Sequence, residues 1–424
     1  MTFNYKHTKY ASYLGCITQA IIVNLPPLLF VVFQREFQVT LEQLGLMISL
    51  NFGTQILVDF LAAKFAGKLG YRRCVVAAHI LCAIGTIGLG VFPSVLGLGY
   101  TGILLATVIN AIGGGLIEVL ISPIIEALPG DEKASAMSIL HAFYCWGQVA
   151  VVLLSTLYFS LAGIQSWAFL TSLWALIPLF NIWFFTRVPL QELEEGVEAA
   201  PPGHLFRVKI FWIFFLLMVC SGAAEQAMAQ WASLFAELGL NISKSWGDLL
   251  GPCAFAALMG IARSIYGIWG SRMNLTRALA FSGISCLASY LVAVFSPIPL
   301  ISLIGCAVCG FSVGIMWPGT ISLSAKRYPW GGTAMFAILA LAGDLGCSAG
   351  PGLVGLVSNA VQDGFLPVLD GLKALIPATE TTELGLKLGL LAAILFPLIL
   401  LLLLGCLAVS FRDKKALAPS SKPE

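Results

Sequence analysis

Charged residues are scarce in this chain, since Asp, Glu, Lys and Arg make up 10% of its 424 residues. Soluble domains usually carry about 25% charged and about 45–50% apolar residues. Here 58% of the residues are apolar and the mean hydropathy is +0.92, which excludes a soluble enzyme. One membrane-spanning helix needs about 20 mostly apolar residues. The composition therefore predicts an all-α membrane protein with little chain left for a soluble domain.

Sequence patterns for catalysis or nucleic-acid binding are also missing. The net charge of +2 is too small to indicate a nucleic-acid partner. The chain has no phosphate-binding loop, no His-Glu-x-x-His motif and no metal-ligand spacing. We therefore expect no cofactor, no metal ion, no enzymatic activity and no use of ATP. The eleven cysteines lie almost entirely in apolar runs, which favours small buried side chains over disulfides.

Twelve apolar runs have the length of a membrane span, and they fall into two sets of six. The runs cover about 11–33, 43–66, 73–92, 100–126, 136–160 and 164–186, then about 208–235, 247–268, 274–295, 299–324, 333–358 and 383–409. No small-residue cleavage site follows the first run, so we interpret it as a span. The acidic, proline-containing stretch between the sets predicts bundles at 1–186 and 208–424 joined by a linker at 187–207. We expect the connection at about 359–382 to lie on the membrane surface.

Basic residues predict the orientation. With the N-terminus in the cytoplasm, 18 of the 23 Lys and Arg residues fall on the cytoplasmic side and four on the other, while Arg263 lies within a span. This bias predicts cytoplasmic termini. The halves also share a spacing, since Gly115 and Pro123 in the fourth run match Gly310 and Pro318 in the tenth. Two sets of six helices are typical of repeat-built secondary transporters, whose site lies between the halves.

Charges within a span cost about 2.5–3.5 kcal/mol or more at the helix centre, so each one needs an explanation. Glu118 follows three glycines and precedes Pro123, a setting suited to a carboxyl that binds and releases a proton. The alternative is a protonated Glu bonded to a neighbouring helix. Glu225 is followed by Gln226, Gln230 and Trp231, and amides with an aromatic plane suit a polyhydroxylated ligand. The alternative there is helix packing.

Each of the remaining polar residues in the spans is compatible with more than one role. Asp59, with Lys64 and Arg72 nearby, indicates a gating or structural ion pair. Asp344 suits proton coupling or a structural role equally, and His141 either relays a proton to Glu118 or packs. Arg263 neutralises an acid or caps helix ends at the inner gate. Gln19 and Asn24 lie just before Pro26 and Pro27 and are candidates to line a cavity, unless Asn24 satisfies the backbone freed by proline.

With these features, the chain resembles the major facilitator superfamily over nearly its whole length. The segment AGKLGYRR is similar to the superfamily signature between helices 2 and 3, with Gly70, Arg72 and Arg73 matching and Gly67 where the signature has Asp. The resemblance implies two six-helix bundles that rock about a cavity lined by helices 1, 4, 7 and 10. It also implies that helices 2 and 11, and 5 and 8, meet between the halves. Asp59–Asp344 and His141–Arg263 are then candidate contacts that break during the cycle, and Arg72 and Arg73 are candidate gating residues.

Within the superfamily the chain resembles the fucose–galactose–glucose:proton symporter group. GGLIEVLISP is similar to that group's Gly-x-x-x-Glu-x-x-x-x-Pro stretch and places its membrane carboxylate on Glu118. LHAFYCWGQ, ARSIYGIWGSR and WPGTISLSAK resemble further stretches of the group, and they carry His141, Arg263 and Trp317. One departure is clear: the sugar symporter it resembles most has an acid in helix 1, where this chain reads NLPPLLF.

These observations predict a secondary transporter of the cell's inner (plasma) membrane that moves a sugar or related hydroxylated metabolite together with protons. The predicted proton-coupling residues are Glu118, His141 and Asp344. The predicted substrate contacts are Gln19, Asn24, Glu118, Glu225, Gln226, Gln230, Trp231 and Trp317, and the predicted gating residues are Asp59, Arg72, Arg73 and Arg263. We expect a monomer in the lipid bilayer. The alternatives are a proton-driven exporter of amphipathic compounds, drugs or lipids and a non-transporting receptor.

Overall fold

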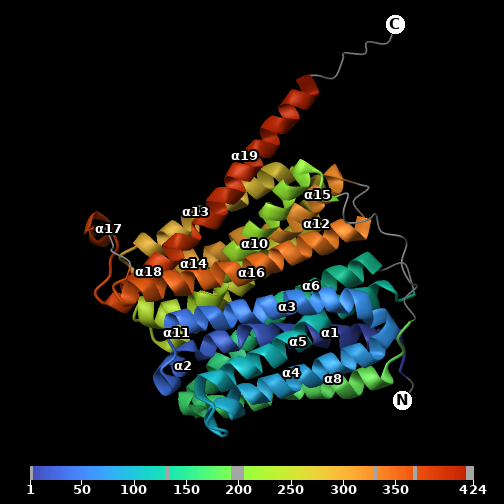
Figure 1. Cartoon of the computed structure of the whole chain (residues 1–424), viewed down its shortest axis with the longest axis horizontal. Helices are drawn as coiled ribbons and strands as arrows, with labels where there is room; N and C mark the ends of the chain where they lie inside the picture. The colour runs from blue at the N-terminus through green and yellow to red at the C-terminus, as the bar shows by residue number, and fades with distance from the viewer. Residues whose placement is uncertain (1–2, 130–132, 192–204, 329–331, 366–369, 417–424) are drawn as a thin grey trace.

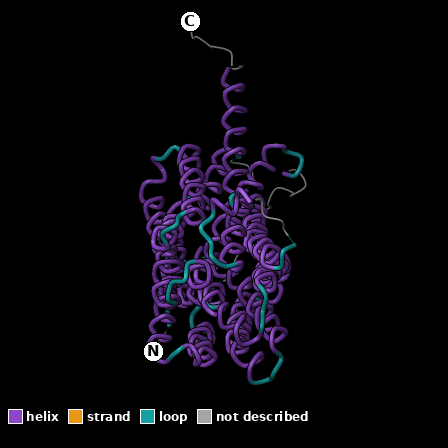
Figure 2. Tube along the Cα trace, turned by 90° about the vertical axis from the view of Figure 1, so that its left-hand side faces the viewer, coloured by secondary structure: helices purple, strands orange, loops and turns teal. Residues whose placement is uncertain are grey.

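The computed structural model describes residues 3–129, 133–191, 205–328, 332–365 and 370–416. Within these ranges the chain is helical and has no strand (Figure 2). Twelve segments of the described chain are long and apolar enough to cross a membrane. The predicted all-α architecture of twelve membrane helices is therefore confirmed.

The first six spans form the lower layer in Figure 1. They comprise α1 (Tyr5–Asn24), η1 (Pro26–Leu29) and α2 (Phe30–Phe37) as span 1; α3 (Leu41–Leu69), α4 (Tyr71–Ser94), α5 (Gly99–Glu126) and α6 (Lys133–Ala162) as spans 2 to 5; and η2 (Ile164–Ser166), α7 (Trp167–Trp174) and α8 (Leu176–Arg187) as span 6. We call this layer the N-half.

The second six spans form the upper layer in Figure 1, the C-half. They comprise α10 (Lys209–Leu234) with η3 (Phe235–Gly239); α11 (Lys244–Asp248), η4 (Leu249–Cys253) and α12 (Ala254–Trp269), followed by η5 (Gly270–Arg272); α13 (Leu275–Phe295); α14 (Pro299–Val313) with α15 (Met316–Arg327); α16 (Gly332–Gln362); and α18 (Thr381–Ala393) with α19 (Leu395–Ala416). The short α17 (Asp370–Leu375) lies between α16 and α18.

Local sequence explains where the spans begin and bend. Asn4 caps α1, because its side chain accepts a hydrogen bond from the backbone N–H of Lys6 at 3.1 Å. Pro26 and Pro27 lack the N–H groups that an α-helix needs, and the chain passes through the 3-10 turn η1 before α2 resumes. Span 10 is interrupted between α14 and α15, directly before the Trp317-Pro318 pair.

The matched glycines of the two halves have matched structural roles. An added Cβ at Gly115 would lie 3.1 Å from the Cβ of Val58, so this glycine lets α5 approach α3. An added Cβ at Gly310 would lie 2.1 Å from the carbonyl oxygen of Phe255, so that glycine lets α14 approach α12. Spans 4 and 10 thus pack on spans 2 and 8 in the same way, as two pseudo-symmetric halves require.

The helix ends define two faces of the molecule. The start of α1, the end of α8 and the start of α10 lie at one end, which we call the terminal face, and α2, α11 and α17 lie at the other, the opposite face (Figure 1). α3 of the N-half and α16 of the C-half run side by side where the layers meet (Figure 1). Most of the predicted linker, residues 192–204, lies outside the described residues.

None of the eleven cysteines, all of which lie in the described ranges, forms a disulfide. Cys306 and Cys309 are separated by two residues, Ala307 and Val308, and both cysteines are buried in α14. The Sγ of Cys309 lies 3.9 Å from that of Cys286 in α13. These side chains fill space between two apolar helices of the C-half, as small hydrophobic residues do.

Candidate transport cavity between the two halves

A cavity of about 530 Å³ lies between the halves. Its walls come from α1, α3, α5 and α6 of the N-half and from α10, α12, α15 and α16 of the C-half. Spans 1, 4, 7 and 10 therefore all contribute to the lining, as the sequence resemblance implied. The polar side chains in the lining are Gln19, Glu118, Ser122, Tyr144, Glu225, Gln226, Arg263, Ser264, Tyr266, Ser322 and Asp344. Cavities of this size hold small organic molecules.

The cavity extends toward the terminal face. Tyr266 lines it near the end of α12, and Ser322 lines it near the end of α15; the Tyr266 hydroxyl donates a hydrogen bond to Ser322 at 2.7 Å. On the other side, direct contacts between the halves close the space. In this structure the cavity therefore extends toward the terminal face and is closed toward the opposite face.

The first part of this seal joins α3 to α16. The Ser49 hydroxyl donates to the carbonyl oxygen of Ser348 at 2.8 Å, and the Ser348 hydroxyl donates to the carbonyl oxygen of Ser49 at 3.0 Å. Further toward the opposite face, an added Cβ at Gly355 would lie 2.9 Å from the Cα of Gly45. Small residues here allow close backbone approach, the usual way to pack membrane helices tightly.

The second part of the seal uses a proline-freed carbonyl. Pro27 has no N–H to donate to the carbonyl of Val23 four residues earlier. Gln230 of α10 donates its side-chain amide to that oxygen at 3.3 Å, so a bond across the halves replaces the missing one within the helix. Trp231, next to it, is fully buried and donates its indole N–H to the carbonyl of Pro351 in α16 at 3.1 Å.

The third part of the seal is ionic. Asp248, in α11, is 1% exposed and pairs with Lys244 at 3.0 Å. Its carboxylate also accepts a hydrogen bond from Thr156 of α6 at 3.4 Å, across the halves. Nearby, Arg35 pairs with Glu237 at 3.3 Å, again between the halves. The sequence analysis did not single out Asp248, because Lys244 and Asp248 lie at the start of span 8, where charged residues are usually exposed. Their burial is visible only in the folded structure.

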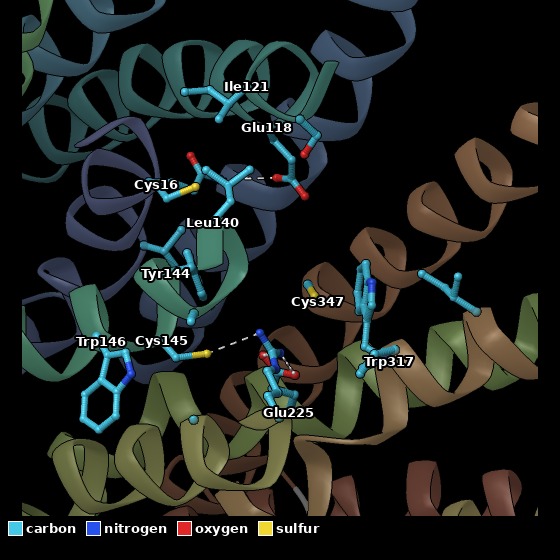
Figure 3. Close-up of a pocket in the computed structure, with 18 of the residues that line it drawn as sticks. Cys16, Glu118, Ile121, Leu140, Tyr144, Cys145, Trp146, Glu225, Trp317 and Cys347 are labelled. Atoms are coloured by element: carbon cyan, nitrogen blue, oxygen red, sulfur yellow. Dashed lines mark hydrogen bonds and ion pairs between the residues drawn. The ribbon is translucent and has the colours of Figure 1, made fainter. Parts of the chain in front are cut away.

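Glu118 lies on the N-half wall of the cavity, and its side chain is exposed to the space (Figure 3). Its carboxylate accepts a hydrogen bond from the amide nitrogen of Gln19 at 3.3 Å, and the same nitrogen donates to Gln55 at 3.0 Å. Among the side chains that the structure describes, no cation contacts Glu118. A carboxyl bound only by an amide is free to exchange a proton without breaking an ion pair.

Glu225 lies on the C-half wall and has a cation (Figure 3). It is 6% exposed, and Arg263 approaches its two oxygens at 3.2 and 3.5 Å. Gln226 donates an amide hydrogen to Glu225 at 3.4 Å. Arg263 also donates to the Sγ of Cys145 in α6 at 3.5 Å, so spans 5 and 8 meet between the halves, as the resemblance implied. Arg263 neutralises an acid, one of the two roles that the sequence left open.

Asp59 and Asp344 come from different halves and lie within hydrogen-bonding reach of each other. This is the approach that the sequence resemblance predicted. The Oδ1 of Asp59 is buried against Gly115 of α5, where an added Cβ would lie 3.1 Å away, and it has no hydrogen-bond partner in the described chain. Asp344 lines the cavity and is 6% exposed.

Aromatic side chains complete the lining. Trp317 lies across α16 at Gly343, where an added Cβ would lie 2.1 Å from the ring. Tyr144 projects from α6 into the cavity (Figure 3). The sequence analysis did not choose Tyr144, because its neighbours Phe143 and Trp146 give the same aromatic signal and only the helix rotation separates them. Phe52, Trp146 and Tyr266 also line the space.

Several predicted site residues lie elsewhere. Asn24 donates to the carbonyl of Ala20 within α1, and Gln230 and Trp231 belong to the seal rather than to the cavity lining. Arg72 donates to the carbonyls of Phe185 and Val188, which fixes the end of α8 within the N-half. Arg73 is exposed on α4. The side chain of His141 lies outside the described residues, so its predicted relay to Glu118 and its predicted contact with Arg263 stay predictions.

Metal-ligating groups of three or more His, Cys, Asp or Glu side chains do not occur in the described part of the chain. Two hydrogen-bonded sets of polar side chains lie in and beside the cavity. Gln19, Gln55 and Glu118 form an acidic set without a cation, and Glu225, Gln226 and Arg263 form a set whose charges cancel. Donors, acceptors and aromatic planes of this kind suit a small polar organic solute.

Comparison with known proteins matches residues 12–351 to the model of a family described as the Major Facilitator Superfamily. The chain is similar to the membrane protein MosC of Rhizobium meliloti, with 26% identity over 333 residues that cover 76% of each protein. Its fold is similar to that of a bacterial homolog of the human lysosomal transporter Spinster in an inward-facing and occupied conformation, with a TM-score of 0.71. The two sequences are 16% identical, and the match covers 96% of this chain and 98% of the homolog. The fold is also similar to that of a D-xylose–proton symporter, with a TM-score of 0.72. The two sequences are 14% identical, and the match covers 92% of this chain and 97% of the symporter.

Proposed function

This chain belongs to the Major Facilitator Superfamily, and from that premise we propose that it takes up a small hydroxylated solute, such as a sugar, together with protons. The two halves rock about the cavity, which opens to each side of the membrane in turn. The basic residues support a cytoplasmic terminal face in the inner (plasma) membrane. On this proposal the structure is the inward-open state, and the protein acts as a monomer.

The observation that carries this proposal is a cavity sealed at one end, with an unneutralised carboxyl on one wall and a hydrogen-bonding set on the other. Gln226 and Glu225 supply an amide and a carboxylate on the C-half, and Gln19 supplies an amide on the N-half. Sugar hydroxyls need such paired donors and acceptors. Trp317 offers an aromatic face for the apolar side of a sugar ring.

Glu118 is the proposed proton-binding residue. It faces the cavity and its described partner is the amide of Gln19, so proton loss or gain there changes the charge that a bound solute meets. His141, whose side chain lies outside the described residues, remains a proposed relay, and Asp344 a proposed second coupling residue. Asp59 is proposed to gate through its contact with Asp344, and Arg263 through its contact with Cys145. Arg72 and Arg73 remain proposed gating residues.

The test uses purified protein in proteoliposomes with a pH-sensitive dye inside. Fucose, galactose, glucose, xylose, sugar acids, nucleosides and a few amphipathic cations are added outside, one at a time. We expect one hydroxylated solute to acidify the interior. Glu118→Gln should abolish accumulation driven by a proton gradient while retaining counterflow exchange, because exchange needs the cavity but no net proton movement.

Glu42→Gln is the matched control, because Glu42 is exposed at the opposite-face end of α3, away from the cavity. It should behave like the unaltered protein. A solute that is transported with the same proton movement in Glu118→Gln would contradict the role of Glu118. Transport of a solute with no proton movement in any variant would contradict proton coupling.

A second candidate is proton-driven export of amphipathic compounds. The aromatic side chains Phe52, Trp146 and Tyr266 and the apolar remainder of the lining favour it. Methionine, which adapts to varied apolar ligands, does not occur in the described lining, whereas carboxyl and amide groups do. Dye movement with amphipathic cations and silence across the sugars would favour this second candidate.

A further inference from the structure

Asp59 and Asp344 form a carboxyl pair that spans the two halves. Asp59 belongs to α3 and Asp344 to α16, the two helices that join the halves through the Ser49–Ser348 contact. The two carboxyl groups lie within hydrogen-bonding reach of each other. Since Asp344 is one turn from Ser348 and lines the cavity, the pair lies on the cavity side of the seal.

The surroundings of the pair are acidic. Glu118 faces both carboxyls from α5, and Cys347 is the nearest titratable neighbour on α16. The cation closest in the cavity wall, Arg263, is already bound to Glu225. In the described part of the chain no Lys or Arg side chain contacts either aspartate; the side chain of Lys64, one turn from Asp59 on α3, lies outside that part.

Two ionised carboxylates at this separation repel each other strongly away from bulk water. A single proton between them changes the sign of the interaction, because the protonated group donates a short charge-assisted hydrogen bond to the ionised one. Pairs of carboxyls that face each other in this way generally share one proton. The contact between Asp59 and Asp344 therefore requires a proton, or another cation, in the structure observed.

We propose that Asp59 and Asp344 together form a binding site for one proton, which holds α3 against α16 and stabilises the state in which the cavity opens to the terminal face. Loss of this proton lets the two carboxylates repel, separates α3 from α16 and favours the state open to the opposite face. The site is distinct from Glu118, and it operates whatever solute the cavity carries and whether or not Glu118 couples transport to protons.

The test measures hydrogen–deuterium exchange of the two sealing segments, residues 41–55 of α3 and 345–358 of α16, between pH 5 and 9 without substrate. Exchange is normalised to a peptide of α4 from the same digest, because the chemical exchange rate itself depends on pH. For a site that binds one proton, the opening equilibrium changes by up to about tenfold per pH unit. We expect normalised exchange in both segments to rise with pH in the unaltered protein.

Asp59→Asn and Asp344→Asn each place an amide opposite the remaining carboxylate. The amide donates a hydrogen bond to that carboxylate and so takes the place of the shared proton. Each variant should show low exchange at all pH values. Asp363→Asn, an exposed change beyond the end of α16, should keep the pH dependence. Asp59→Ala should give high exchange throughout, because it removes the contact without a substitute.

Two outcomes overturn the proposal. The first is an unchanged pH dependence in both asparagine variants, with a folded protein shown by a single monodisperse peak. The second is a fall in exchange on adding Na⁺ or K⁺ at pH 9, which assigns the pair to a metal cation. The measurement needs neither transport nor a solute. The proposed proton site can therefore be wrong while the proposed uptake is right, and the uptake can be wrong while the proton site is right.

Discussion

The two glutamates of the cavity show how one space holds two kinds of carboxyl. Glu225, on the C-half wall, has Arg263 at 3.2 Å and an amide hydrogen bond from Gln226. Glu118, on the N-half wall, has the amide of Gln19 at 3.3 Å and no cation among the described side chains. The first has a fixed opposite charge beside it, and the second has none among the described side chains. On the proposed function, Glu118 is the glutamate whose charge changes during transport, and Glu225 keeps its ion pair with Arg263.

Removal of the cation should cause the largest loss of stability. Arg263→Gln leaves Glu225 buried without its ion pair, and breaking one partner of such a pair costs about 3–5 kcal/mol. We expect a value near the lower end, because the Arg263 side chain is 26% exposed. The free energy of unfolding in detergent, from denaturant titration, measures the loss. The double variant Glu225→Gln/Arg263→Gln should recover most of it, and equal losses in the single and double variants would show that the pair is not what stabilises the C-half wall.

Overpacking of the same wall should have the next largest effect. Gly343→Ala places a methyl group about where the Trp317 ring lies, and such insertions cost about 1–3 kcal/mol. Gly371→Ala, which meets no atom within 4 Å, is the control. We expect lower stability and a shifted Trp fluorescence spectrum for Gly343→Ala alone. An unchanged spectrum together with unchanged stability would mean that the C-half wall adapts as readily as the N-half wall.

The contrast between the walls also shows what the sequence reveals and what it does not. Twelve spans were predictable, because long apolar runs are forced by the bilayer. Glu118, Glu225, Asp344 and Arg263 were identified because a charge in a span is costly. Their pairing was not predictable, since which charges meet depends on the rotation of each helix about its axis. The sequence left Arg263 to pair with His141 or with any acid, and the structure pairs it with Glu225.

Aromatic and amide residues show the same limit more clearly. Trp231 and Trp317 look equally suited to stack on a ligand, yet Trp231 is buried in the seal and Trp317 lines the cavity. Gln230 was predicted to contact substrate, and in this structure its amide bonds to the carbonyl that Pro27 frees. The proline was visible in the sequence, but the partner of the freed carbonyl comes from the other half of the chain. Gln55 gave no signal at all, because its role depends on the position of Gln19.

Gln19→Leu should have a smaller effect than either change on the C-half wall. It removes the hydrogen bonds to Gln55 and Glu118, and a net hydrogen bond contributes about 1 kcal/mol. The loss is limited because the Oε1 of Gln19 already lacks a partner in the described chain. Unfolding titrations of Gln19→Leu and of Gln19→Leu/Gln55→Leu measure it, and we expect the second variant to recover stability. A loss as large as that of Arg263→Gln would mean that the N-half wall is as rigid as the C-half wall.

Glu118→Gln should have the smallest effect on stability. The amide oxygen still accepts the hydrogen bond from Gln19, and no described cation is left without its partner. We expect the free energy of unfolding to stay within about 0.5 kcal/mol of the unaltered protein, the range of substitutions that remove no specific interaction. The matching change on the other wall, Glu225→Gln, leaves Arg263 unpaired and should cost several times more. If both changes cost the same, Glu118 has a fixed partner of its own, and the variable charge of the cavity must be sought at the Asp59–Asp344 pair.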